Sequence, residues 1–94
     1  MAKGYWIAHI TVQDDAEYEA YKAANAKAFG KYGGRFLVRG GPFECVSGAA
    51  RERHVVIEFD SYEQALACHH SPEYAEAIRH RDKASESNII IEGL

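Results

Sequence analysis

The pattern of hydrophobic and polar positions predicts four β-strands, over residues 5–12, 35–39, 53–59 and 88–92. Each run is rich in β-branched or aromatic residues and is bounded by residues typical of turns. In the first run, one face is apolar throughout and consists of Trp6, Ala8, Ile10 and Val12. In the third run, alternate positions form a similar face of Val55, Ile57 and Phe59. We expect both faces to pack on helices.

Helical periodicity separates these strands. After Asp14, a typical helix N-cap residue, apolar side chains recur at helical spacing to about Tyr32, and a glycine pair follows. A second helical segment is predicted from Ser61 to His69. A third begins at Ser71 and is expected to continue to about Ala84. Residues 43–50 fit neither period and are expected to form either a hairpin arm that crosses to a partner or an edge strand that folds back.

The order β-α-β-β-α-β predicts a ferredoxin-like α+β fold, an antiparallel sheet with helices on one face. Residues 1–94 are expected to form a single domain. The other face of the sheet is then open, and we expect it to carry Tyr5, Ile7, Leu37, Val56 and Ile90. So much exposed apolar surface favours a homodimer through the open sheet face, with a second copy covering it.

Composition narrows the class of protein. The net charge is −3, the pI is about 5.9, and acidic and basic residues are interspersed, which argues against binding to nucleic acid. No apolar run approaches the roughly 18–20 residues that span a membrane. Cys45 and Cys68 lack CxxC spacing, and the chain shows no secretory signal, so we expect reduced thiols in a cytoplasmic protein.

Candidate catalytic side chains lie among the polar positions of the open sheet face. The first and third strands are central in this fold, so we expect His9 and Glu58 to be neighbours that act as a general base and its orienting acid. Arg35 and Arg39 are expected to hold a carboxylate or enolate oxygen of a substrate. The alternative is a lattice of Arg–Glu salt bridges in which His9 is a packed polar residue.

Further candidate ligand-binding residues are Asn25, Tyr74 and Arg81. Asn25 interrupts the apolar stripe of the first helix, and Arg81 follows Tyr74 at helical spacing. The alternatives are a local hydrogen bond for Asn25, a core position for Tyr74 and a side chain that extends to solvent for Arg81.

No cofactor or metal is predicted. Neighbouring histidines on a helix point about 100° apart, so His69 and His70 are poorly placed to share an ion, and no HxxxH or HxxE spacing cleanly includes these residues or His80. The paired glycines are typical of turns and form no phosphate-binding motif.

Several segments resemble the bacterial family known as domain of unknown function 1330. They are residues 4–9 (GYWIAH), 21–25 (YKAAN), 31–41 (KYGGRFLVRGG), 55–59 (VVIEF), 71–74 (SPEY) and 91–93 (IEG), together with Arg81. The resemblance covers essentially the whole chain and implies a dimeric α+β barrel, in which two ferredoxin-like sheets pair face to face.

The resemblance implies little about activity, because the family itself is uncharacterised. Its wider fold relatives include cofactor-free monooxygenases, muconolactone-isomerase-like enzymes and haem-dependent proteins, an analogy at the level of fold alone. The family often has tryptophan where Ala50 stands, and aromatic residues near Cys68 and His69. Their absence here implies a more open or more polar pocket.

Three functions therefore remain open. The first is a cofactor-independent enzyme of the isomerase or monooxygenase type that acts on a small anionic organic molecule. The second is a non-catalytic homodimer that binds a small ligand or a partner protein. The third is a homodimer whose polar residues serve structure alone.

Overall fold

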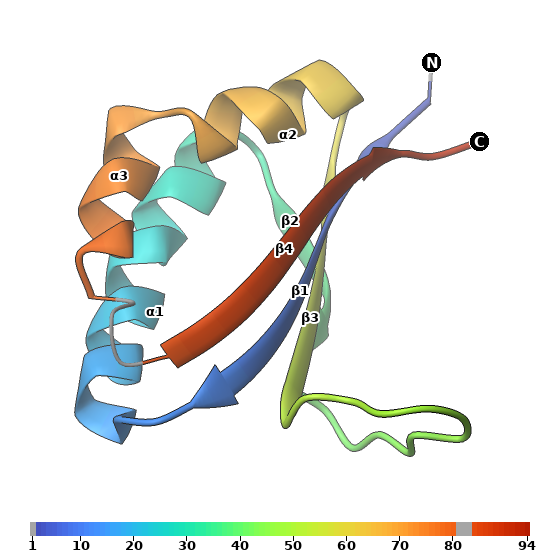
Figure 1. Ribbon diagram of the computed structural model, residues 1–94. Coiled ribbons are helices and arrows are strands. Elements are labelled where there is room, and N and C mark those ends of the chain that lie inside the picture. The colour runs from blue at the N-terminus through green and yellow to red at the C-terminus, as the bar shows by residue number, and fades with distance from the viewer. Residues whose placement is uncertain (1, 81–83) are drawn as a thin grey trace.

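The computed structural model describes residues 2–80 and 84–94. In chain order its elements are β1 (Gly4–Val12), α1 (Asp15–Lys31), β2 (Arg35–Arg39), β3 (Arg53–Phe59), α2 (Tyr62–His69), α3 (Pro72–Ile78) and β4 (Ala84–Glu92). The strands form one antiparallel sheet in the order β2-β3-β1-β4. The helices lie together on one of its faces (Figure 1). The ferredoxin-like α+β fold is confirmed.

Local sequence sets the ends of the helices. The Glu17 backbone N–H donates to the Asp14 carboxylate at 3.1 Å, which satisfies one of the donors that a helix start leaves unpaired. Ser61 and Ser71 accept from the backbone N–H groups three residues ahead in the same way, each at 3.1 Å. Gly33 ends α1 at φ +74°, a conformation that costs glycine little.

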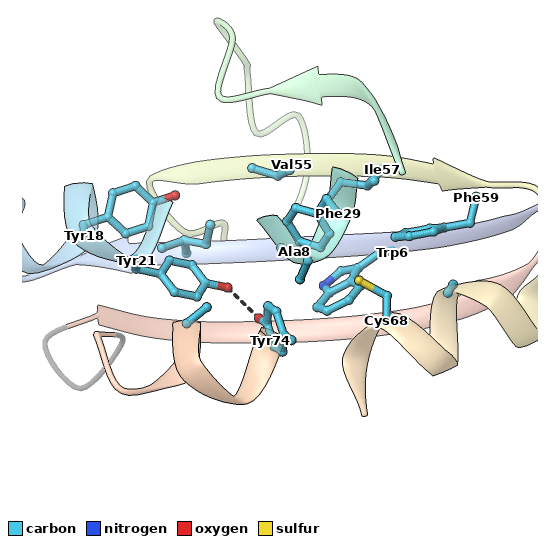
Figure 2. Packing of buried hydrophobic residues seen from close by; sticks show 14 residues of the cluster. Trp6, Ala8, Tyr18, Tyr21, Phe29, Val55, Ile57, Phe59, Cys68 and Tyr74 are labelled. Carbon is cyan, nitrogen blue, oxygen red and sulfur yellow. Dashed lines mark hydrogen bonds between the residues drawn. The ribbon is translucent and has the colours of Figure 1, made fainter. Parts of the chain in front are cut away.

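The core lies between the helices and the sheet (Figure 2). Trp6 is 1% exposed and is surrounded by aromatic rings, with ring centroids 4.8 Å from Tyr74 and 5.1 Å from Phe29. Edge-to-face contacts of this kind favour one arrangement of the rings beyond what burial alone supplies. The predicted helix-facing positions of β1 and β3 are thus confirmed.

The boundary between α3 and β4 differs from the prediction. The expected helix to about Ala84 is wrong, because α3 ends at Ile78 and β4 already begins at Ala84. β4 pairs with the whole of β1, from Gly4 opposite Glu92 to Val12 opposite Ala84. The backbone hydrogen bonds of this long ladder outweigh the helical preference of the local sequence.

A β-bulge in β2 reverses the expected facing of two residues. Phe36 lies opposite Ile57, but the next paired residue is Val38, opposite Val56, so Leu37 is an extra residue. Val38 therefore lies on the open face. Arg39, expected on the open face, lies opposite the buried Val55 and so on the helix side.

The register of β4 also differs by one residue from the expectation. Ile90 lies opposite Trp6 and is packed against the core, so its expected place on the open face is wrong. Ile89 and Ile91, opposite Ile7 and Tyr5, occupy the open face instead. They are 49% and 50% exposed. A slip of one residue in register exchanges the faces of every side chain in a strand.

Residues 41–52 form an exposed arm without helix or strand. The arm leaves the end of the sheet between β2 and β3 and projects to the side away from the helices (Figure 1). Residues 43–50 therefore do not form an edge strand, which was one of the two expectations for them. The other expectation, an arm that crosses to a second copy, stays a prediction. Within residues 2–80 and 84–94, no helix is long and apolar enough to span a bilayer.

Candidate functional site

A pocket of about 380 Å³, counted to the open solvent at its mouth, lies between α1 and the sheet. Its floor is apolar and is formed by side chains of α1 and of the strands β1, β2 and β3. The apolar lining residues include Trp6, Ile10, Phe29, Phe36, Val55 and Ile57. Little of this volume is enclosed, because these side chains pack closely against one another.

Cationic side chains surround the mouth of this pocket. Lys22 and Arg53 both approach the Tyr18 ring, with Nζ 5.4 Å and the guanidinium carbon 5.6 Å from its centroid. The guanidinium carbon of Arg39 lies 4.4 Å from the centroid of the Phe36 ring. Stacking on a ring positions a guanidinium while leaving its N–H donors directed outward.

These cations are incompletely neutralised. Lys22 pairs with Glu19 at 2.9 Å, a surface contact three residues apart on α1. Within the described part of the chain, neither Arg39 nor Arg53 forms an ion pair, and the buried Nε of Arg53 has no hydrogen-bond partner. Gly40 makes room for Arg53, since a Cβ at its φ of +67° would lie 2.1 Å from a guanidinium nitrogen. The mouth is therefore a positively charged surface.

Asn25 lies in the same pocket, as its place in the α1 stripe suggested. Tyr18, Tyr21 and Asn25 line one side at helical spacing, and Asn25 is only 9% exposed. The structure thus brings two of the candidate residues, Asn25 and Arg39, to one pocket from different elements. An amide donor and a guanidinium are both able to bind a carboxylate oxygen.

Tyr74 lies behind the pocket and does not line it. Its side chain is fully buried, and its hydroxyl oxygen is 2.6 Å from that of Tyr21, whose ring does line the pocket (Figure 2). Tyr74 is therefore connected to the pocket through Tyr21. Arg81 lies outside the described residues.

Arg35 and Glu58 form a salt-bridge cluster on the open face. Arg35 Nη2 lies 3.1 Å from both Glu58 Oε1 and Asp60 Oδ1, and the Tyr5 hydroxyl donates to Glu58 Oε2 at 3.2 Å. The hydrogen bond to Glu58 raises the pKa of Arg35 and also that of Tyr5. This arrangement matches the alternative of a structural ion-pair lattice for these two residues.

His9 does not lie beside Glu58, and the expectation that they are neighbours is wrong. His9 is opposite His54 in the β1–β3 register, and Glu58 is opposite Tyr5. Four residues of extended strand separate the two positions by roughly 13 Å. The Nδ1 atoms of His9 and His54 are 2.8 Å apart. A general base oriented by Glu58 is therefore not formed within one chain.

Sequence reasoning missed Arg53, Lys22 and His54 as site residues. Arg53 is in phase with Val55, Ile57 and Phe59 and therefore belongs to the helix-facing side of β3, which alternation alone could have shown. Nothing in the sequence around Lys22 distinguishes it from the other lysines of the chain. Pairing of His54 with His9 depends on the register between two strands 45 residues apart.

The other titratable candidates do not gather into a site. Among the described residues, no three His, Cys, Asp or Glu side chains are placed to hold a metal ion. Burial raises the pKa of the Cys68 thiol to about 12, so it is protonated at neutral pH and unsuited to nucleophilic attack. His69 packs against Trp6, with ring centroids 5.4 Å apart.

Solved structures with the same fold include a protein of unknown function from Rhodopseudomonas palustris, at a TM-score of 0.79 and 18% identity over 99% of this chain and 83% of that one. A dimeric protein of unknown function with a ferredoxin-like fold from Bacteroides fragilis matches at 0.62 and 15%, over 96% and 95% of the two chains. SnoaB, a cofactor-independent oxygenase from Streptomyces nogalater, matches at 0.65 and 15%, over 97% and 92%. At these identities the likeness is one of fold.

No curated protein matches the sequence. The model of the family described as domain of unknown function (DUF1330) matches residues 3–94. That match spans β1 to the last residue and includes every element that builds the pocket. The chain therefore belongs to the family of domain of unknown function 1330.

Proposed function

We propose that this protein is a homodimer that binds a small anionic organic molecule in the pocket between α1 and the sheet. The observation that carries the proposal is the combination of an apolar, aromatic floor with Lys22, Arg39 and Arg53 at the mouth. The apolar part of a ligand replaces water against the floor, and its anionic group meets the guanidinium groups and the Asn25 amide.

Electrostatics support an anionic ligand. Arg39 and Arg53 lie beside aromatic rings and next to an apolar pocket, where the attraction between opposite charges is stronger than in bulk water. A neutral ligand of the same shape would leave these charges uncompensated and gain only apolar burial. A cationic ligand would be repelled.

The open sheet face supports the dimer. Val38, Ile89 and Ile91 are 42%, 49% and 50% exposed, and they lie on the same face as Ile7 and Val56. A contiguous apolar area of this kind on a small protein favours burial against a partner. The related protein from Bacteroides fragilis is dimeric, and pairing two identical faces gives a closed, two-fold arrangement.

A cofactor-independent reaction in the same pocket is the second candidate. It is favoured by the Tyr21–Tyr74 hydroxyl pair, whose 2.6 Å hydrogen bond lies beside the apolar floor. Tyr21 would then exchange a proton with the ligand, and Tyr74 would position it. Roles for His9 and Glu58 as catalytic residues stay a prediction, since both lie on the opposite face of the sheet from this pocket.

Two arginines of β2 provide a matched test of the binding site. Arg39 faces the pocket, while Arg35, four residues earlier, pairs with Glu58 on the open face. In a screen of small carboxylates and phenolates by thermal shift and calorimetry, Arg39→Ala should weaken binding of a hit by about tenfold or more, because a charge-assisted hydrogen bond is lost. Arg35→Ala should bind the same hit as wild type does.

Equal losses in Arg39→Ala and Arg35→Ala would contradict the proposed location of the site. Tighter binding of the neutral analogue than of the anionic analogue of one compound would contradict the proposal that the ligand is an anion. To separate binding from catalysis, the hits are incubated with wild type and with Tyr21→Phe, and the products are analysed by mass spectrometry. Turnover that disappears in Tyr21→Phe while binding persists supports the second candidate.

A further inference from the structure

Two guanidinium groups lie over different aromatic rings of the pocket between α1 and the sheet. The guanidinium carbon of Arg53 is 5.6 Å from the centroid of the Tyr18 ring, near the start of α1. The guanidinium carbon of Arg39 is 4.4 Å from the centroid of the Phe36 ring, and that ring contacts Phe29, near the end of α1, at 5.7 Å. At a rise of 1.5 Å per residue, Tyr18 and Phe29 are about 16 Å apart along the helix axis. The two cations therefore lie at opposite ends of the pocket.

The register of the sheet gives a second measure of their separation. The ring under the Arg39 guanidinium lies opposite Ile57 on β3. The Arg53 guanidinium instead lies against Gly40, where an added Cβ would collide with it. The Gly40 N–H donates to the carbonyl oxygen of His54 at 2.9 Å. Along an extended strand, His54 and Ile57 are roughly 10 Å apart, which is too far for one carboxylate to contact both guanidinium groups.

The lining between the two guanidinium groups is apolar. Val55 lies between Arg53 and Ile57 on the helix-facing side of β3, and Ala8 is its partner on β1. Both residues line the pocket and are buried. Among the described residues, no aspartate or glutamate lines the pocket. The lining is therefore cationic at both ends and apolar in the middle.

Each end also has a second polar group. At one end, the Nε of Arg53 is buried with no hydrogen-bond partner among the described residues, so a carboxylate on this guanidinium would offset the cost of burying it. Lys22 lies over the same aromatic ring at 5.4 Å, although its charge is shared with an acidic neighbour on α1. At the Arg39 end, Asn25 lines the pocket one helical turn before Phe29. Both ends can therefore bind an anionic oxygen.

We infer that the ligand of this pocket is a dicarboxylate, with two anionic groups joined by an apolar spacer such as a benzene ring or a short alkyl chain. This ligand class rests on the proposed function and narrows it from anions to dianions. One carboxylate meets Arg53 and the other meets Arg39, while the spacer replaces water against Val55. A monoanion of the same shape neutralises only one of the two guanidinium groups and should bind more weakly.

Matched pairs of compounds test the need for a second charge. Terephthalate, adipate and suberate are each compared with their own monomethyl ester, which keeps the spacer and one carboxylate. In calorimetric titrations of wild type, at least one dicarboxylate should bind about tenfold or more tightly than its monoester, because a second charge-assisted hydrogen bond forms. In Arg39→Gln and in Arg53→Gln this preference should fall below about twofold, because one carboxylate then has no guanidinium to meet.

Arg35→Gln is the matched control, because Arg35 pairs with Glu58 on the open face, and it should keep the preference of wild type. Wild type that binds every monoester as tightly as its dicarboxylate would overturn the dicarboxylate class, even if no variant folds. If those monoesters still depend on Arg39, the proposed anion site stands. A preference that persists in Arg39→Gln or Arg53→Gln would also overturn the dicarboxylate class. Failure of all these compounds to bind at millimolar concentration would overturn both proposals.

Discussion

Cys45 and Cys68 show how far burial alters the chemistry of one side chain. Cys45 lies in the exposed arm, where its thiol donates to the carbonyl oxygens of Ser47 and Gly48 at 3.4 Å. Cys68 lies in α2 against the core and is fully buried (Figure 2). Burial raises its pKa to about 12 because the thiolate would lose its hydration. The thiolate is the reactive form, so the two residues should differ in reactivity.

Thiol labelling should therefore distinguish the two cysteines. At about pH 8, an aromatic disulfide reagent should modify one thiol per native chain and two per chain unfolded in denaturant. Cys45→Ser should leave the native protein unlabelled and the unfolded protein with one reactive thiol. Labelling of native Cys45→Ser at the rate of an unfolded chain would contradict the burial of Cys68.

At the scale of elements, an ion pair joins α1 to α3. Lys31, in the last turn of α1, donates to Glu73 in the first turn of α3 at 2.8 Å. The hydrogen bond from Lys31 lowers the pKa of Glu73, and the backbone N–H at the start of α3 acts in the same direction. A carboxyl whose pKa is depressed in the folded chain stabilises the fold at pH values above its ordinary pKa. This contribution is lost as the pH falls through the depressed pKa.

Replacement of Glu73 should thus have a pH-dependent effect on stability. Glu73→Gln should lower the Tm by a few degrees at most at about pH 7, since the pair is at the surface. The difference from wild type should shrink as the pH falls through the depressed pKa of Glu73, and it should disappear once the carboxyl is protonated in both folded and unfolded chains. Thermal unfolding of wild type and Glu73→Gln, followed by circular dichroism at neutral and at acidic pH, measures these differences in Tm.

Glu76→Gln is the control for this measurement. Glu76 forms an ion pair with Arg79, three residues away in the same segment, at 3.4 Å. Its replacement does not touch the contact between α1 and α3 and should change the Tm less at neutral pH. A Glu73→Gln difference that persists unchanged at acidic pH would show that the ion pair is not its cause.

At the scale of the whole molecule, the two faces of the sheet have different roles. The helix-covered face holds the core and the proposed anion pocket, and the open face holds the proposed dimer contact and the His9–His54 pair. The open face combines Ile89 and Ile91 with the Arg35–Glu58 cluster. In the proposed homodimer, the apolar area would supply affinity between copies, and the charged cluster would restrict their orientation.

A charge placed within the apolar part of the open face should disrupt the dimer. Ile89→Glu should shift the protein from dimer to monomer at micromolar concentration in sedimentation velocity, because the carboxylate would be buried without a partner. Leu94→Glu, at the exposed end of the chain, should remain dimeric. Wild type that sediments as a monomer under these conditions would refute the homodimer.

Most of the fold follows from local features of the sequence. Alternation identified the helix-facing positions of β1 and β3, and the serine and aspartate caps placed the helix starts where the structure has them. These features are decided by contacts between residues near one another in the chain, such as the Asp14–Glu17 hydrogen bond. The end of α3, the start of β4 and the facing of residues in β2 and β4 were predicted wrongly, since pairing across the sheet decides them.

Composition and periodicity alone determined the class of fold, the buried faces and the presence of cationic and polar side chains among apolar ones. Tertiary structure alone decided which of these side chains meet. The bulge at Leu37 turns Arg39 toward Asn25, and the β1–β3 register places His9 beside His54 rather than Glu58. The reason is physical: strand register is set by the sum of many weak contacts across the sheet, and a shift of one residue moves each side chain to the other face.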